Sequence, residues 1–301
     1  MDGLLRRWGL QGYDVRALTA GTNNAGYYVG DDFVLRIHRN PVAPYEHAVL
    51  RALGGLSFAV PVPVPADDGS TVVRGELQGE VVSASLSRRI PGEHPVRGDA
   101  VRARAAGAAL AELDDVLGRL DPAGLPPGAM WDGDLTTIHP RVPSLGPLID
   151  GIPADRRAEV ARILTGIRPR KDLPRQIIHG DFAPTNVLMV GDRVTAILDF
   201  ETCGPGYRAM DLAVGSYFFG NFGQPTAASE AFRRGYLSRY PLTDAELNAL
   251  PDLELMREAT SLVHWHGRYL DGLTTEQDIA DRVERLLTVA AHTGRMVPPV
   301  G

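Results

Sequence analysis

The sequence predicts an α+β protein of two lobes: a small, mainly antiparallel β lobe that contains one helix, and a larger, mainly helical lobe. Two observations support this. In the first ninety or so residues, short apolar runs alternate with turn residues, whereas later segments are long, alanine- and leucine-rich and poor in helix breakers. Between them, residues 87–92 read Ser-Arg-Arg-Ile-Pro-Gly and interrupt the pattern. We therefore expect lobes at residues 1–88 and 89–301.

The small lobe begins with a group of short strands. Residues 15–20 form the first strand candidate and are followed by a turn-rich stretch. Residues 26–29 and 33–38 are expected to pair as a hairpin, because Gly30-Asp31-Asp32 between them is typical of a tight turn.

The rest of the small lobe combines one helix with further strands. Residues 44–53 change to helical spacing, with a proline near the start, where its missing N–H costs little. Residues 60–65 read Val-Pro-Val-Pro-Val-Pro, which favours an extended edge or irregular strand. With strands at 71–73 and 80–86, about five strands are expected.

The second lobe is expected to be helical, with one β interruption. Helices are predicted at residues 100–120, 154–166, 244–270 and 275–293. Residues 121–153 are rich in Pro and Gly and predict a long surface excursion. Residues 187–190 and 193–200 predict a hairpin joined by Gly191-Asp192.

Composition excludes several functions. The formal net charge of −6 gives no basic surface for nucleic acid. No apolar run approaches the ~20 residues that span a bilayer, and the N-terminus lacks the apolar stretch of a signal peptide. The single cysteine, Cys203, rules out an intrachain disulfide or a zinc site of several thiolates and is expected to be inert. A cytoplasmic protein without membrane or nucleic-acid partners is the default expectation.

The residues suited to chemistry are concentrated at 177–211. Asp181 follows the apolar pair Ile177-Ile178, and Asn186 comes five residues later, directly before the predicted hairpin. Asp199 ends the second strand of that hairpin, so Asn186 and Asp199 are expected at one edge. These three oxygen-bearing side chains suit magnesium rather than a softer metal.

This equipment matches the needs of phosphoryl transfer. Asp181 is the expected base that accepts the proton of an attacking hydroxyl, and Asn186 and Asp199 are the expected metal ligands. The alternative is that the segment is an ordinary turn followed by an ordinary hairpin. The joint occurrence of His-Gly-Asp, the five-residue spacing, the hairpin and Asp-Phe-Glu favours the catalytic interpretation.

The same segment resembles the aminoglycoside phosphotransferase and choline kinase superfamily, which has a protein-kinase-like fold. His179-Gly180-Asp181 with Asn186 matches its catalytic loop, and Asp199-Phe200-Glu201 matches its metal-binding motif. Asp211 matches an acidic position that supports the catalytic loop, a role that His179 shares. The resemblance implies a magnesium-dependent kinase that uses ATP or GTP to phosphorylate a hydroxyl group of a small molecule.

The resemblance also implies nucleotide-binding residues in the small lobe. Gly21, Asn23 and Asn24 lie where the family has a loop that covers phosphate, and a permissive glycine suits close approach of the backbone. In the family this role also needs a lysine on the third strand, where this sequence has Arg36, with Glu46 as its expected partner. An arginine that merely projects into solvent is the alternative, and ATP and GTP both remain open as donors.

The acceptor is less well defined. Glu201 and Tyr207 follow the metal motif and are candidates to border it, whereas His264, Trp265 and His266 are expected to pack or face solvent. The acceptor could be an amino alcohol such as homoserine, a sugar-like or choline-like metabolite, or an aminoglycoside-type antibiotic. A nucleotide-binding pseudokinase scaffold is the alternative function, because the small lobe lacks a lysine. A protein kinase is a third, less favoured option.

Overall fold

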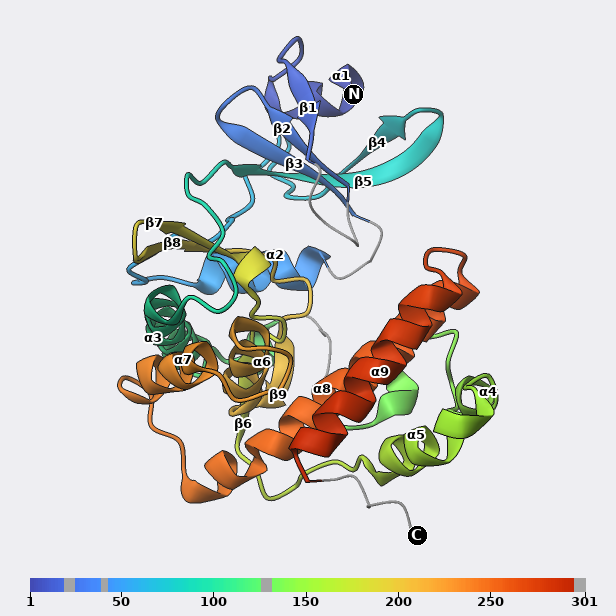
Figure 1. The fold of residues 1–301 in the computed structure, drawn as a ribbon. Helices are drawn as coiled ribbons and strands as arrows, with labels where there is room; N and C mark the ends of the chain where they lie inside the picture. The colour runs from blue at the N-terminus through green and yellow to red at the C-terminus, as the bar shows by residue number, and fades with distance from the viewer. Residues whose placement is uncertain (19–24, 39–42, 126–131, 295–301) are drawn as a thin grey trace, which may run out of the picture.

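The computed structural model describes residues 1–18, 25–38, 43–125 and 132–294. Figure 1 shows an antiparallel sheet at the top of the molecule and a largely helical body beneath it. The predicted α+β fold, with a β lobe that precedes a helical lobe, is confirmed.

The small-lobe sheet has five antiparallel strands in the order β1-β2-β3-β5-β4. The strands are β1 Val15–Ala17, β2 Ala25–Val29, β3 Phe33–His38, β4 Val73–Leu77 and β5 Glu80–Arg88. The predicted hairpin is present as β2 and β3. The strand predicted at 71–73 instead starts where that range ends, because the chain from Val73 pairs with β5.

Two further parts of the small lobe differ from expectation. The proline-rich segment 60–65 forms no regular strand and contributes an isolated bridge between Pro63 and Ser87, because alternating prolines lack the N–H groups that a ladder needs. A short helix α1, Asp2–Leu5, followed by a 3-10 turn at Arg6–Trp8, was not predicted. Its buried Leu4 and Leu5 join the core beneath the sheet.

Helix α2, Ala43–Ala52, follows the sheet's third strand as the sequence predicts. Its buried side chains Tyr45, Val49 and Leu50 belong to the main core of the helical lobe rather than to the core of the sheet. The helix therefore connects the two lobes and places Glu46 between them.

The helical lobe is built around α3, α6, α7 and α8. Its α-helices are α3 Ala100–Leu117, α4 Gly146–Asp150, α5 Ala154–Gly166, α6 Met210–Phe219, α7 Ala227–Leu237, α8 Asp244–Leu270 and α9 Glu276–His292. Helices α3 and α7 pack backbone to backbone: a Cβ at Gly107 would lie 2.1 Å from the carbonyl oxygen of Phe232, and a Cβ at Gly235 would lie 2.1 Å from that of Arg104. Neither glycine could be replaced without separating the two helices.

One hairpin and one further two-stranded sheet lie around the predicted catalytic segment. The predicted pair is present as β7 Val187–Val190 and β8 Arg193–Ile197. The second strand was predicted to run to residue 200 but ends at Ile197, because Asp199 has a φ of 62°, which lies outside the range of a strand. A second pair, β6 Arg175–Ile178 and β9 Gly204–Tyr207, was not predicted. Together they place the turns that precede β7 and follow β8 at the same end of the helical lobe.

The excursion at 121–153 contains more structure than the sequence suggests. Beside α4 it carries 3-10 turns at Pro122–Gly124 and Leu135–Thr137, and Leu135, Val142 and Leu148 are buried in a second core with α8 and α9. In the part of the chain that is described, no helix is both long and apolar enough to cross a membrane.

Candidate active site

The loop that carries Asp181 is held from behind by the carboxylate of Asp211. The backbone N–H of His179 donates to Oδ2 of Asp211 at 2.6 Å, and that of Gly180 donates to Oδ1 at 2.7 Å. Asp211 is completely buried in the first turn of α6. A carboxylate that accepts two backbone N–H groups fixes the loop without any side chain of the loop.

The imidazole of His179 adds a second constraint. Its Nε2 donates to the carbonyl oxygen of Leu198 at 3.0 Å, and its Nδ1 accepts from the N–H of Asp181 at 3.3 Å. These two contacts assign the ring proton to Nε2. The buried ring also contacts Phe200 edge-on at 4.7 Å. His179 thus ties the turn of Asp181 to the segment that leads to Asp199.

Asn186 connects the same two segments. Its Nδ2 donates to the carbonyl oxygen of Asp181 at 2.8 Å, and its own carbonyl oxygen accepts from the N–H of Leu198 at 2.8 Å. The residue after Leu198 is Asp199. Its φ of 62° lies in the left-handed region of backbone conformation, which residues other than glycine rarely adopt. Such strain persists only where the surroundings impose it and is common at functional sites.

Arg36 bridges the two lobes at this point. Its Nη1 donates to Oε1 of Glu46 at 2.7 Å, and its Nη2 donates to Oδ1 of Asp199 at 2.6 Å. Burial disfavours the cation, but the charges of Asp199 and Glu46 outweigh it and raise the pKa of Arg36. Burial raises the pKa of Glu46 to about 7, against the opposing effect of Arg36. The arginine is therefore a member of an interlobe ion network and does not merely project into solvent.

Arg257, which the sequence did not single out, also contacts the site. Its Nη2 donates to Oδ1 of Asp181 at 3.0 Å from the middle of α8. Burial disfavours its charge, but Asp181 and Glu258 outweigh burial and raise the pKa of Arg257. No local motif marks this residue, because the contact joins positions 76 residues apart.

A buried carboxyl group lies behind the catalytic loop. Oδ2 of Asp114, on α3, accepts from the hydroxyl of Tyr236 at 2.6 Å. Burial and the neighbouring charge of Asp211 raise the pKa of Asp114 well above the usual range. The shift favours the protonated form of Asp114, which avoids two adjacent buried charges.

The remaining residues predicted to bind the nucleotide or the acceptor lie in different parts of the molecule. Gly21, Asn23 and Asn24 lie outside the residues that the structure describes. Glu201 is near Arg36, where its charge raises the pKa of that arginine. Tyr207 does not border an open acceptor site: it is fully buried, and its hydroxyl donates to the carbonyl oxygen of Asp132 at 2.7 Å and accepts from a backbone N–H.

The histidines and the cysteine occupy packing positions. The ring of His264 lies 5.8 Å from that of His139, and burial lowers the pKa of His264 to about 4. Cys203 is buried, and burial raises the pKa of its thiol. Neither residue contacts Asp181 or Asp199 through a described hydrogen bond.

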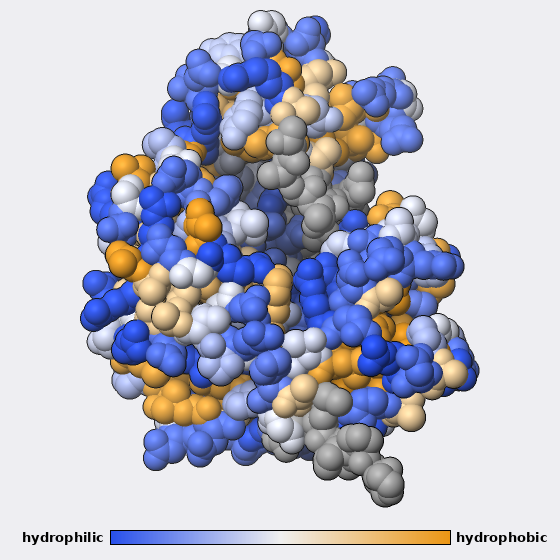
Figure 2. Space-filling view, in the orientation of Figure 1, coloured by the Kyte–Doolittle hydropathy of each residue, from blue (hydrophilic) through white to orange (hydrophobic). Residues whose placement is uncertain are grey.

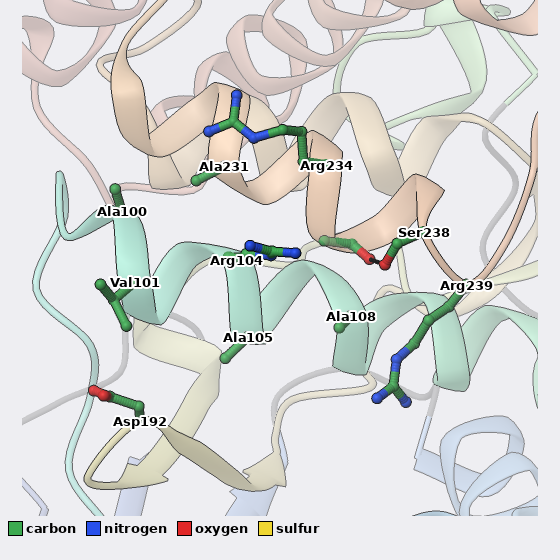
Figure 3. A pocket seen from close by; sticks show the side chains of 11 residues that line it. Ala100, Val101, Arg104, Ala105, Ala108, Asp192, Ala231, Arg234, Ser238 and Arg239 are labelled. Atoms are coloured by element: carbon green, nitrogen blue, oxygen red, sulfur yellow. Dashed lines mark hydrogen bonds between the residues drawn. The ribbon is translucent and has the colours of Figure 1, made fainter.

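The surface is hollowed between the small lobe and the helical body, and the residues visible around the hollow are largely hydrophilic (Figure 2). A separate open pocket lies between α3 and α7 (Figure 3). It is lined by small side chains and by Arg104, Arg234 and Arg239 but by none of the predicted catalytic residues. The predicted catalytic residues are thus not part of that pocket.

Comparisons with known proteins point in the same direction. Residues 14–250 match the family model described as the phosphotransferase enzyme family. A homoserine kinase from Gluconacetobacter diazotrophicus is 32% identical over 95% of this chain and 93% of its own length. A homoserine kinase from Acidiphilium cryptum is 28% identical over 92% of this chain and 91% of its own.

Solved structures share the fold. A microcompartment-associated aminopropanol kinase superposes with a TM-score of 0.67 at 22% identity, over 95% of this chain and 92% of that one. A GDP complex of an aminoglycoside 2'-phosphotransferase-IIIa gives a TM-score of 0.68 at 17% identity, over 96% of both chains.

Proposed function

Because the chain belongs to the phosphotransferase enzyme family, we propose that it transfers the terminal phosphate of ATP or GTP to the hydroxyl of a small amino alcohol. The observation that carries this proposal is the junction around Asn186. This side chain holds the backbone of Asp181, and its own backbone holds the residue before Asp199. The base and the acidic metal ligand that the reaction needs are thereby linked through one residue.

The residues at this junction fit a magnesium ion. Asn186 uses its Nδ2 towards Asp181, which leaves the amide oxygen as a ligand, and Asp199 supplies a carboxylate. Among the described residues, no group of three or more His, Cys, Asp or Glu is arranged as a self-sufficient metal site. Magnesium commonly completes its shell with water and substrate phosphates, so two protein ligands suffice. When bound, it would neutralise charge on the phosphates.

Asp181 is the residue that we assign to proton transfer. The acceptor hydroxyl oxygen bonds to the terminal phosphorus, the bond to the leaving nucleoside diphosphate breaks, and the hydroxyl proton passes to the Asp181 carboxylate. His179 and Asn186 fix the backbone of Asp181 through hydrogen bonds at 3.3 Å and 2.8 Å. The base is therefore oriented before the acceptor arrives.

Arg36 is the residue that we assign to the nucleotide. It lies on β3, contacts the expected metal ligand Asp199 and is held by Glu46. A guanidinium in this place supplies a fixed fork of donors to phosphate oxygens. The ion pair with Glu46 also removes the main argument for a scaffold without catalytic activity, which was the missing lysine.

The names of the relatives support the proposed acceptor class. The curated relatives are named homoserine kinases, and the aminopropanol kinase has the same fold. Homoserine and aminopropanol are both small molecules with an amino group and a hydroxyl group, so an amino alcohol is the acceptor class that these names share.

The test is a kinase assay with magnesium, either ATP or GTP, and L-homoserine or 3-aminopropanol, with the product identified by phosphorus NMR. We expect a phosphomonoester of at least one acceptor. Asp181→Asn should lower kcat at least about 100-fold, the usual contribution of a general base, while nucleotide binding persists. Asp150→Asn, at an exposed position on α4, is the matched control. Unchanged turnover in Asp181→Asn would overturn the assignment of the base.

A further inference from the structure

A cation lies directly beside the proposed base, and phosphoryl transfer alone does not require it. Arg257 donates from Nη2 to Oδ1 of Asp181 at 3.0 Å, and its side chain is only 13% exposed. Its guanidinium lies 5.2 Å from the centre of the Phe218 ring. This hydrogen bond occupies Oδ1, one of the two carboxylate oxygens of the proposed base. A second role for Arg257 would account for its position.

Two more guanidinium groups gather on the neighbouring ring of Phe222. The Cζ atoms of Arg97 and Arg285 lie 3.9 Å and 4.5 Å from its centre. The ring of Tyr217 contacts Phe222 at 5.5 Å and Phe218 at 5.0 Å. A continuous row of aromatic rings thus joins these two arginines to the arginine beside the base.

The row is held in place by the backbone. Phe222 has a φ of 49°, in the left-handed region that a bulky side chain adopts only under constraint. The N–H of Gly98, next to Arg97, donates to the carbonyl oxygen of Phe219 at 3.3 Å. The loop before α3 is thereby tied to the end of α6, which keeps Arg97 against the ring.

A fourth arginine, Arg282 on α9, lies 4.2 Å from the ring of Trp265. We call Arg97, Arg257, Arg282 and Arg285 the arginine cluster. Burial and then the charge of Arg285 lower the pKa values of both Arg97 and Arg282. The positive charge of Arg285 therefore acts on both Arg97 and Arg282.

The charge of the arginine cluster is poorly neutralised. Within the described ranges, no ion pair with a carboxylate is found for Arg97, Arg282 or Arg285, whereas other partly buried arginines, such as Arg208, are paired. The carboxylates close to the cluster are Asp181 and the buried Glu258. Four guanidinium groups thus face two carboxylates, one of which is the proposed base.

We propose that the arginine cluster binds the carboxylate of the acceptor, so that the enzyme selects a hydroxylated amino acid over an amino alcohol without a carboxylate. The planar donor fork of arginine matches a carboxylate in geometry and charge. Arg257 touches the base itself, so an acceptor whose hydroxyl reaches Asp181 lies beside the arginine cluster. The same charge disfavours polycationic antibiotics.

A consequence concerns the base. A carboxylate that accepts from Nη2 of Arg257 competes with Oδ1 of Asp181 for this donor. Binding of the correct acceptor then releases that oxygen for the acceptor hydroxyl. Arg257 is in this sense a positioning residue as well as a specificity residue.

This inference rests on the proposed function and is tested by two acceptors that differ in one group. 3-Aminopropanol retains the hydroxyl and amino groups of L-homoserine but has hydrogen in place of the carboxylate. We expect kcat/KM to be about 100-fold higher for homoserine, since each charge-assisted hydrogen bond contributes roughly tenfold or more. Arg285→Met should raise the KM for homoserine about tenfold with little change in kcat, and it should leave the kinetics with 3-aminopropanol unaltered.

Arg97→Met is the second variant, and Arg234→Met, at an exposed position on α7, is the matched control. Calorimetric titration of L-homoserine into protein saturated with a non-hydrolysable nucleotide measures the same effect without turnover. Thermal unfolding checks that each variant folds.

The outcomes separate the two proposals. Equal kcat/KM for both acceptors, or equal losses for both in Arg285→Met and Arg97→Met, would overturn the carboxylate site and leave the kinase function intact. Binding of homoserine that weakens in these variants, without phosphorylation of either acceptor, would support the site and overturn the proposed function. Both proposals would be overturned if homoserine were neither bound nor phosphorylated and 3-aminopropanol were not phosphorylated either.

Discussion

Nη2 of Arg36 lies 2.6 Å from Oδ1 of Asp199, across 163 positions of sequence and between the two lobes. The same guanidinium donates from Nη1 to Glu46 at 2.7 Å. One side chain therefore satisfies two carboxylates at once, and the planar separation of its two nitrogens makes this possible. A lysine offers a single charged nitrogen and cannot reproduce this fork.

The first prediction concerns Arg36→Lys. We expect the KM for the nucleotide to rise about tenfold, because the ammonium can pair closely with only one of Glu46 and Asp199. Initial rates measured against nucleotide concentration at saturating magnesium give this value. Arg16→Lys, on an exposed part of β1, is the control and should behave as the wild type. A nucleotide KM in Arg36→Lys within twofold of the wild type would show that a cation paired with only one of the two carboxylates is sufficient for nucleotide binding.

The second prediction concerns the metal. In Asp199→Asn a neutral amide replaces the carboxylate, so the magnesium concentration for half-maximal rate should rise at least about tenfold, as expected when a charged oxygen ligand is lost. The measurement is initial rate against magnesium at constant free nucleotide. Asp192→Asn, in the exposed turn of the β7–β8 hairpin, is the matched control. The same half-saturation in Asp199→Asn and the wild type would exclude Asp199 as a ligand.

The third prediction concerns the support of the catalytic loop. Asp211 accepts from two backbone N–H groups, those of His179 and Gly180. Asp211→Asn keeps one acceptor oxygen and turns an amide donor towards the other N–H. We expect the free energy of unfolding to fall by about 1–3 kcal/mol, the cost of an unsatisfied buried donor, and kcat to fall with it.

Urea unfolding and steady-state kinetics on the same preparation test this third prediction. Asp155→Asn lies in the first turn of α5 and is exposed, so it provides a control with the same chemical change. If Asp211→Asn unfolded at the wild-type urea concentration, the two hydrogen bonds would have no part in fixing the loop.

The parts of the site that the sequence predicted are those determined by local spacing. Asp181, Asn186 and Asp199 lie within 19 positions of one another, and one hairpin brings them together. Helix α8 has its predicted bounds, and its start agrees with local chemistry, because Thr243 and Glu246 form a standard capping box there. Here local chemistry and tertiary structure favour the same conformation.

The parts that were not predicted depend on tertiary contacts or on atypical local signals. Helix α6 is apolar on nearly all sides because it is enclosed by the core, so it has no helical periodicity. Helix α7 starts with a capping box in which Ser229 takes the place usually held by Glu or Gln. Arg257 reaches Asp181 only because α8 packs beside the catalytic loop. The strand β9 and the buried position of Tyr207 depend on pairing with β6.

The last prediction concerns pH and Asp114. Burial and Asp211 raise the pKa of this carboxyl group in the folded protein, whereas in the unfolded chain it ionises near the ordinary aspartate value. Above that ordinary value the unfolded state binds fewer protons than the folded state. Stability must therefore fall as pH rises, by up to about 1.4 kcal/mol per pH unit for this group, until the raised folded pKa is reached.

Asp114→Asn preserves the shape of the neutral carboxyl group but cannot ionise, so its stability should fall less steeply with pH than that of the wild type. Urea unfolding at several values between about pH 5 and 8 measures the two slopes. Burial raises the pKa values of Glu46 and Glu254 to about 7. These two groups make stability fall with pH in the wild type and in Asp114→Asn alike. The difference between the two slopes therefore comes from Asp114. Asp115→Asn, the exposed neighbour on α3, should leave the slope unchanged. Parallel curves for Asp114→Asn and the wild type would mean that Asp114 is ionised in the folded protein, and the two adjacent carboxyl groups would then need another source of neutralisation.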